Sequence, residues 1–500
     1  MAGLFGAAAR AVGAGGRLGY RWGQSVSGRM DEARRNAPAA TGLLVPGDPT
    51  PVGGGHDYLD FRGCATARDV GTSNGTFELG TAVDLRSSLR RRRVVGPRLA
   101  LTMSELNRHA LIVGQTGSGK TASVMVPWIV QAMRDGHSVV AIDAQGNLAS
   151  KVKDWTTHTG PTGARVSVWN YLSPDTASWN WISSLTSRAR IDAAVTAILG
   201  PSPRSTGANV DPHYWDNDAN VLTAMFEFAQ AVASRPMNAE LLVSTLRSRD
   251  RLEDRLQSRQ SAPGYDFLHD LTLLGYDDYT RKVSGAVTAL SALATPEVSR
   301  AITAPGIDVA AQVDEHRLWI ISTPQSGGEL SRRLASLAVG SVLQRLYERQ
   351  NAGGSHRHVL LVIDETSEIS ERVAIDAAVS QLRSANVSIV LGLQSIEQLS
   401  SERTRNTVLG NTATKVLFPG SSPGTVDYVS KRLGTRPAAS GAVTSGPGTR
   451  QLTHSTEQVP VLGHRELGQL WGGDRAGLVL FDLPGRTAKP VLVDLYRPEL

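Results

Sequence analysis

The stretch Gly114-Gln115-Thr116-Gly117-Ser118-Gly119-Lys120-Thr121 decides the fold of this 500-residue chain. It follows the apolar run 109–113, which predicts a strand, and it precedes residues 121–134, whose pattern predicts a helix. A glycine-rich loop that ends in Gly-Lys-Thr, between a strand and a helix, is typical of a phosphate-binding loop. The alternative is a glycine-rich surface turn, which would not require this context.

The residue types in this loop match the chemistry of a bound nucleotide. Glycines let successive backbone N–H groups point at phosphate oxygens, Lys120 can reach the β- and γ-phosphates, and Thr121 can offer its hydroxyl to Mg²⁺. The implied ligands are therefore ATP and Mg²⁺. The residues expected to bind them are Gly114, Gln115, Thr116, Gly117, Ser118, Gly119, Lys120, Thr121 and Ala122.

Composition narrows the class of protein. The chain is too long for one core, and its hydrophobic share of 41% is ordinary for a globular protein. Cys64 is the only cysteine, which excludes a disulfide framework and cysteine-based metal sites. No run approaches the roughly 18 to 20 apolar residues of a membrane-spanning helix. We expect a cytoplasmic protein and leave open its recruitment to the cytoplasmic face of the membrane.

The net charge of +6 is concentrated near the N-terminus. Residues 1–110 contain 15 Arg and no Lys against 9 Asp and Glu, whereas the rest of the chain is balanced. The excess peaks at Arg90-Arg91-Arg92-Arg93. Such a run can contact a nucleic-acid backbone or anionic lipid, or it can be a solvated turn.

The order of apolar runs predicts an α/β fold with a mostly parallel sheet. Strand candidates at 109–113 and 138–143 flank one helix, which makes a right-handed βαβ unit. Apolar residues between 191 and 315 fall at helical spacing, which predicts an inserted all-α domain. Four regions are therefore expected: a flexible basic tail (1–56), a β lead-in with the first half of the core (57–190), the all-α domain (191–315) and the second half of the core (316–500).

The remaining elements are expected at defined places. A helix is expected over 329–350, and Pro127 should kink or shorten the helix that follows the phosphate-binding loop. The Gly/Ser/Thr/Pro-rich residues 434–458 predict a long loop. Further strands are expected at 165–169, 318–322, 359–363, 387–394, 414–418, 477–481 and 490–494.

Two carboxylates follow the strand expected at 359–363. Asp364 can orient Mg²⁺, directly or through water, and Glu365 can activate the water that attacks the γ-phosphate. An exposed strand end is the alternative interpretation. The expected metal ligands are thus Thr121 and Asp364, and the expected catalytic residues include Lys120 and Glu365.

Three more polar residues stand near strand ends. Gln394 could hydrogen-bond the γ-phosphate and report its loss, or it could be an ordinary loop glutamine. Arg383 is a candidate arginine finger for the site of a neighbouring subunit, or a surface arginine in a salt bridge. Asp143 could belong to the site or could cap the turn that follows it.

The order of these motifs resembles the conjugative coupling ATPases of type IV secretion systems, the TraG-like family, which are RecA-like relatives of the FtsK and HerA DNA pumps. The resemblance covers about residues 100–498. It implies a RecA-like P-loop core and a ring, usually a hexamer, that threads DNA. It also implies single-stranded DNA, the relaxase with its relaxosome and the secretion channel proteins as partners. The segments that carry it are 109–127, 138–148, 179–180, 211–228, 364–365, 394–399, 411–418 and 465–496.

Two features depart from that family. Many members begin with transmembrane helices, and the sequence predicts none here. The segment after the second core strand is usually Asp-Pro-Lys-Gly-Glu, and here it is Asp143-Ala144-Gln145-Gly146-Asn147. The role of those positions is therefore left open.

The expected function is that of a ring-forming, Mg²⁺-dependent ATPase that moves DNA during conjugative transfer. Three alternatives stay open. One is a HerA- or FtsK-like translocase of double-stranded DNA in DNA partitioning or phage defence. The others are a docking adaptor that does not hydrolyse nucleotide and a receptor that exports protein effectors. The intact set Lys120, Thr121, Asp364 and Glu365 argues against the adaptor.

Overall fold

The computed structural model describes residues 61, 63–70, 75–84, 94–206, 211–232, 237–257, 259–302, 306–399, 401–446, 449–470 and 476–495. The expected N-terminal tail and the run Arg90 to Arg93 lie outside these residues. In the described part of the chain, no helix combines the length and the apolar character needed to cross a membrane. The larger compact unit comprises residues 59–436 and 460–500.

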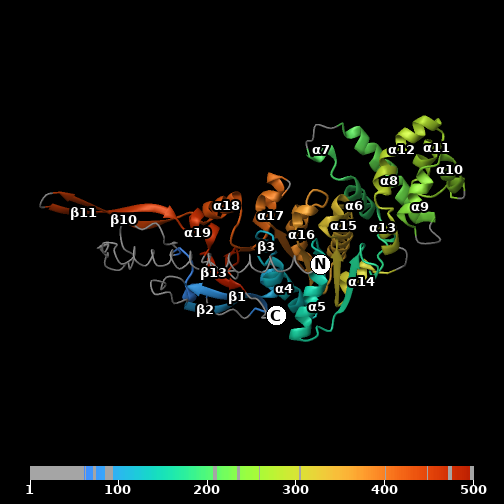
Figure 1. Cartoon of the computed structure of the whole chain (residues 1–500). Helices are drawn as coiled ribbons and strands as arrows, with labels where there is room; N and C mark the ends of the chain where they lie inside the picture. The colour runs from blue at the N-terminus through green and yellow to red at the C-terminus, as the bar shows by residue number, and fades with distance from the viewer. Residues whose placement is uncertain are drawn as a thin grey trace, which may run out of the picture. The chain divides into compact units, whose positions relative to one another are not determined.

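One 11-stranded sheet organises this unit (Figure 1). Its parallel part has the order β9 (Thr414–Leu417), β3 (Ala110–Val113), β8 (Val387–Leu393), β7 (Val359–Ile363), β4 (Ser138–Asp143), β6 (Arg317–Ser322) and β5 (Arg165–Asn170). Antiparallel strands extend it beyond β9: β12 (Ala476–Phe481), β13 (Val491–Leu495), β1 (Phe77–Asp84) and β2 (Val94–Leu101). The α/β fold with a mostly parallel sheet is confirmed.

The central strands are mostly apolar because helices cover both faces of the sheet. Every residue of β3, β4, β7 and β8 is buried. Leu111 and Val113 pack with α6 (Arg188–Leu199) and α15 (Gly328–Ala352), whereas Ala110 and Ile112 pack with α4 (Val126–Arg134) and α5 (Leu148–Thr159). Alternate side chains therefore enter different cores, which explains why these strands show no polar alternation.

The helix after the phosphate-binding loop changes its hydrogen-bond register at Pro127. It begins as a π-helix over Thr121–Met125 and continues as α4 from Val126. The Val126 N–H donates to the carbonyl of Thr121, five residues earlier. Pro127 has no N–H to donate in the next position, so the register changes just before it. The helical residues still run from Thr121 to Arg134, so the helix is not shortened, and the expected kink at Pro127 stays a prediction.

The described residues between β5 and β6 form helices and no strand. α8 packs against α6, α11 and α12, so these helices share one core. The four-region division of the chain stays a prediction. The helices are α6, α7 (Pro203–Thr206), α8 (Pro212–Val232), α9 (Ala239–Leu246), α10 (Arg249–Gln257), α11 (Tyr265–Thr272), α12 (Tyr276–Ser291), α13 (Pro296–Ala301) and α14 (Val309–Asp314).

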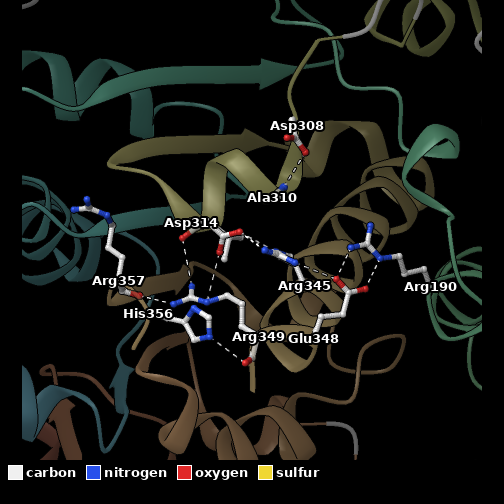
Figure 2. A network of polar contacts seen from close by, with 10 residues as sticks. Arg190, Asp308, Ala310, Asp314, Arg345, Glu348, Arg349, His356 and Arg357 are labelled. Atoms are coloured by element: carbon white, nitrogen blue, oxygen red, sulfur yellow. Dashed lines mark hydrogen bonds and ion pairs between the residues drawn. The ribbon is translucent and has the colours of Figure 1, made fainter. Parts of the chain in front are cut away.

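A network of polar contacts links two of the helices between β5 and β6, α6 and α14, to α15 (Figure 2). Glu348 on α15 pairs with Arg190 on α6 at 2.7 Å. Arg349 is buried, lies 3.5 Å from the carboxylate of Asp314 on α14, and donates to the carbonyl of Arg357 at 2.5 Å. Burial lowers the pKa of Arg349, and the charge of Asp314 opposes that shift. Paired charges therefore join the ends of α14 and α15, and a hydrogen bond to a backbone carbonyl joins them to the approach to β7.

The prediction of a long loop over residues 434–458 is wrong. Residues there form a two-stranded ribbon of β10 (Thr435–Gly446) and β11 (Thr449–Pro460), which is a sheet of its own. The sequence between the strands is Pro447-Gly448, a strong turn signal. Two strands that pair only with each other need no continuous apolar face. Their Gly, Ser and Thr residues therefore show no hydropathy pattern that would predict a strand.

Candidate nucleotide-binding site

The phosphate-binding loop follows β3 and takes a shape that requires glycine. Gly117 and Gly119 have φ of 79° and 98°, in the left-handed region that favours glycine. At Gly114 a Cβ atom would lie 2.6 Å from the Cβ of Phe418, too close for any other residue. The Gly114 N–H donates to the carbonyl of Leu393 at 3.0 Å, which ties the loop to the end of β8.

Lys120 lies inside this loop. Its side chain is 4% exposed, and its Nζ donates to the carbonyl of Gly114 at 2.6 Å. The same Nζ lies 3.8 Å from a carboxylate oxygen of Glu365. The Oγ of Ser118 is buried without a hydrogen-bond partner among the described residues, so it is free to donate to a ligand. The loop thus has the positive charge and the donors that a phosphate needs.

Asp364 faces the hydroxyl of Thr121 across this site. Thr121 Oγ1 donates to Asp364 Oδ2 at 2.9 Å. The other oxygen, Oδ1, is buried, and within the described ranges no group donates a hydrogen bond to it. A Cβ on Gly392 would lie 3.1 Å from that oxygen, so glycine on β8 keeps the space open. A hydroxyl and a carboxylate with an unused oxygen fit Mg²⁺, which prefers oxygen ligands.

Burial and the neighbouring positive charges shift the pKa of Asp364 in opposite directions, and burial has the larger effect. Burial raises the pKa, while the hydrogen bond from Thr121 and the charges of Lys120 and Lys151 lower it. A bound cation would favour the ionised carboxylate in the same way.

Glu365 is held beside Lys120 in a strained backbone conformation. Its φ and ψ are 57° and 58°, a left-handed geometry that costs a residue other than glycine about 1–3 kcal/mol. The side chain is 2% exposed, and Gln394 Nε2 donates to its Oε2 at 3.2 Å. Burial raises the pKa of Glu365, and Lys120 lowers it. A raised pKa suits a general base, because the carboxylate then binds a proton more readily.

The structure brings Gln394 to this site and leaves Arg383 at the other edge of the sheet. Gln394 directly follows β8 and contacts Glu365. Arg383 precedes β8, is exposed, and accepts a hydrogen bond on its carbonyl from Asn107, which precedes β3. The length of β8, about 20 Å at about 3.3 Å per residue, therefore separates Arg383 from the loop of its own chain.

Asp143 caps the turn that follows β4. One oxygen accepts from the N–H groups of Gln145 and Gly146 at 3.1 and 2.8 Å. The other accepts from the Leu148 N–H at 2.9 Å and from the Ser322 hydroxyl at 2.8 Å. Of the two interpretations left open for Asp143, these contacts support the cap.

A cavity of about 440 Å³ opens between the loop and α5. Sequence reasoning missed the wall that α5 contributes, because no motif marks it and only the fold places it opposite the loop. The lining residues are Gln115, Gly117, Gly119, Lys120, Thr121, Ala122, Val126, Gln145, Lys151, Asp154 and Trp155.

Arg372, which follows Glu365 along the chain, contacts α6, one of the helices between β5 and β6. Arg372 donates to the carbonyls of Ala197 and Ile198 at the end of α6, at 3.0 and 3.2 Å, and it pairs with Glu329 of α15. The guanidinium therefore occupies the otherwise unsatisfied carbonyls of the helix end. Six residues separate Arg372 from Glu365, the candidate base.

The chain is similar to known proteins of conjugation. Its sequence matches the family model described as Type IV secretory system Conjugative DNA transfer over residues 86–459. Its fold is similar to that of the unbound bacterial conjugative coupling protein TrwBdeltaN70, with a TM-score of 0.60, 17% identity, and coverage of 79% of this chain and 87% of that chain. No curated protein matches the sequence.

Two further structures have the same fold. The plasmid coupling protein TrwB in complex with ADP and Mg²⁺ gives a TM-score of 0.58 at 16% identity and covers 79% of this chain and 87% of that one. VirB4 of Thermoanaerobacter pseudethanolicus gives 0.50 at 11%, with 86% and 98% covered. At these identities the similarity shows the fold alone, a RecA-like P-loop core. The family model matches well over half of the chain, and the chain therefore belongs to the type IV secretory system family of conjugative DNA transfer proteins.

Proposed function

We propose that this chain hydrolyses ATP with Mg²⁺ and uses the energy to move DNA into a type IV secretion channel. One observation carries the proposal: two buried carboxylates are held against an intact phosphate-binding loop. Thr121 donates to Asp364 at 2.9 Å, and Glu365 lies 3.8 Å from Lys120. A protein that only docked partners would not need a buried general base at this place.

The residues of the site have separate roles. Thr121 and Asp364 would hold Mg²⁺, which offsets the negative charge of the β- and γ-phosphates. Lys120 and the loop N–H groups bind those phosphates. Glu365 orients the attacking water and accepts its proton. Gln394 donates to Glu365, so loss of the γ-phosphate can be relayed to β8 and the loop after it.

The assembly that we propose is a homo-oligomeric ring, a hexamer, in which Arg383 of one copy acts on the site of the next. The ring would bind single-stranded DNA through its phosphate backbone and without sequence preference. The family to which the chain belongs supports DNA and the secretion system as partners. The TrwB structure with ADP and Mg²⁺ supports the choice of nucleotide and metal.

Single-stranded DNA is expected to stimulate ATP hydrolysis severalfold, and Lys120→Ala to abolish it. Phosphate release by the purified chain is measured without DNA, with single-stranded DNA and with duplex DNA. Stimulation should weaken steeply between about 50 and 200 mM salt, because contacts to the phosphate backbone release counterions. The thermal melting of the variant is compared with that of the unsubstituted chain to confirm folding.

The other outcomes choose between the alternatives. Stimulation by duplex DNA only would favour a HerA- or FtsK-like translocase. Stimulation by a secreted protein and by neither DNA would favour an exporter of effectors. No hydrolysis, at concentrations where rings form, would contradict the proposal and favour the docking adaptor.

We also propose that the turn between α11 and α12 docks a basic segment of the relaxosome. Phe267, Leu273 and Tyr276 are 37%, 71% and 71% exposed there. Residues 265–280 contain four Asp and no Lys or Arg, and one of these carboxylates, that of Asp278, pairs with Arg281 at 3.1 Å. Exposed apolar side chains among like negative charges are unfavourable unless a partner covers them, and the charge calls for a basic partner.

Replacing Leu273 and Tyr276 together with Ser is expected to weaken relaxase binding about tenfold, because exposed aromatic residues carry much of the energy of an interface. ATP hydrolysis should not change. Tyr214→Ser is the matched control, since Tyr214 is 73% exposed but lies on α8, outside the turn between α11 and α12. Relaxase binding is measured by titration with a labelled relaxase. Equal loss in the control, or no loss in the double variant, would contradict docking at this turn.

A further inference from the structure

The cavity beside the phosphate-binding loop has a second cation that the loop motif does not contain. Lys151, Asp154 and Trp155 lie three and four residues apart on α5, so they share the face that lines the cavity. Lys120 lines it from the loop. Two ammonium groups on different elements thus meet one space of about 440 Å³, which the carboxylate of Asp154 also lines.

α5 is fixed in place, so Lys151 has a defined position. The carboxylate of Asp143 accepts from the Leu148 N–H, the first residue of the helix. Trp155 is 6% exposed and packs into the core under α4, one turn after Lys151. Since both ends of this stretch are held, the side chain of Lys151 extends into the cavity from a rigid base.

The positive charge of Lys151 lies at the end of α5 where a helix disfavours a cation. Lys151 lies in the first turn of α5, a helix of 12 residues with no acidic residue in that turn. The N-terminus of a helix is its positive end, so a cation there is unfavourable and an anion is favoured. Among the described residues, no hydrogen bond or ion pair holds the Lys151 ammonium. An anionic ligand would remove this disadvantage.

The phosphate end of the site is within reach of this charge. Lys151 and Thr121 line the same cavity, and the Thr121 hydroxyl donates at 2.9 Å to the carboxylate of Asp364, at the expected position of Mg²⁺. In a nucleotide bound to such a loop, Mg²⁺ bridges the β- and γ-phosphates. Gln145, which stands where the family's usual segment has Lys, lines the same cavity without a charge.

We propose that Lys151 binds the terminal phosphate and makes the site select a nucleoside triphosphate over a diphosphate. The inference rests on the proposed function in taking a nucleotide as the ligand. It adds a residue of α5 that senses whether the γ-phosphate is present. A site with this cation would release the diphosphate more readily after hydrolysis.

The affinities of ADP and of a non-hydrolysable ATP analogue, each with Mg²⁺, test this assignment. Calorimetric titration gives both without turnover. Lys151→Ala is expected to weaken binding of the analogue about tenfold, the loss of one charge-assisted contact, and binding of ADP less than about twofold. Lys151→Arg should keep the preference for the analogue. Lys153→Ala is the matched control, since Lys153 is exposed on another face of α5 and does not line the cavity.

The remaining outcomes overturn the inference in distinguishable ways. Equal weakening of ADP and the analogue would place Lys151 on the diphosphate part and remove its role in selection. Unchanged binding of both would exclude any contact. Failure of the unsubstituted chain to bind either nucleotide would overturn the nucleotide site itself. The melting temperatures of the lysine variants are compared with that of the unsubstituted chain as the control for folding.

Discussion

ATP hydrolysis by a Glu365→Gln variant is expected to fall by a factor of about 10²–10⁴, the usual contribution of a general base. Glutamine has the same shape and can keep the contact to Gln394, which donates to the glutamate at 3.2 Å. It cannot accept a proton from water. Affinity for ATP should stay within about twofold, because the side chain contacts Lys120 and not the phosphates.

Single-turnover hydrolysis with excess enzyme measures this effect, since it separates the chemical step from binding and release. Glu368→Gln is the matched control: Glu368 ends the short helix that Glu365 caps, and its carboxylate accepts from Gln325 at 3.2 Å. A normal rate in Glu365→Gln, or an equal loss in the control, would contradict the assignment of Glu365 as the base.

The pH dependence of the same rate follows from the environment of Glu365. Burial raises the pKa of this carboxyl above its ordinary value, and Lys120 opposes the shift. Only the ionised form is a base. The rate should therefore be constant at high pH and fall as the pH drops through the raised pKa, at a higher pH than for an exposed glutamate.

Much of the core could be predicted from the sequence, because its strands are buried on both faces. A strand such as 359–363 cannot be mistaken for an amphipathic helix when it is short, β-branched and followed by two acidic residues. The two carboxylates after it and the loop after β3 are local signals. Parallel strands end at the same edge of the sheet, so the fold brings those signals together.

Other features depend on tertiary structure and left no local signal. Lys151 and Trp155 belong to a helix whose sequence is unremarkable, and they become part of the site only because α5 packs beside α4. Asp143 had two equally good interpretations until the turn showed four groups donating to it. The ribbon of β10 and β11 was missed because two strands alone need no apolar pattern.

Replacing Arg383 with Ala is expected to lower hydrolysis by about 10³-fold or more, the usual effect of losing an arginine finger. Arg383 is exposed and lies at the edge of the sheet opposite its own loop. It therefore cannot act on the site of its own chain. In a closed ring each contact joins two different faces of neighbouring copies, so the arginine of one copy can reach the site of the next.

Mixing two inactive variants separates this proposal from a structural role of the arginine. An Arg383→Ala copy keeps Glu365, and a Glu365→Gln copy keeps Arg383. In mixed rings about a quarter of the contacts combine an intact site with an intact arginine, and hydrolysis should return to that extent. Arg403→Ala, at another exposed arginine, should stay active alone. If mixing restores nothing although mixed rings form, Arg383 does not act between subunits, and the charge that stabilises the transferring phosphoryl group must come from elsewhere, with Lys151 of the same chain as the first residue to substitute.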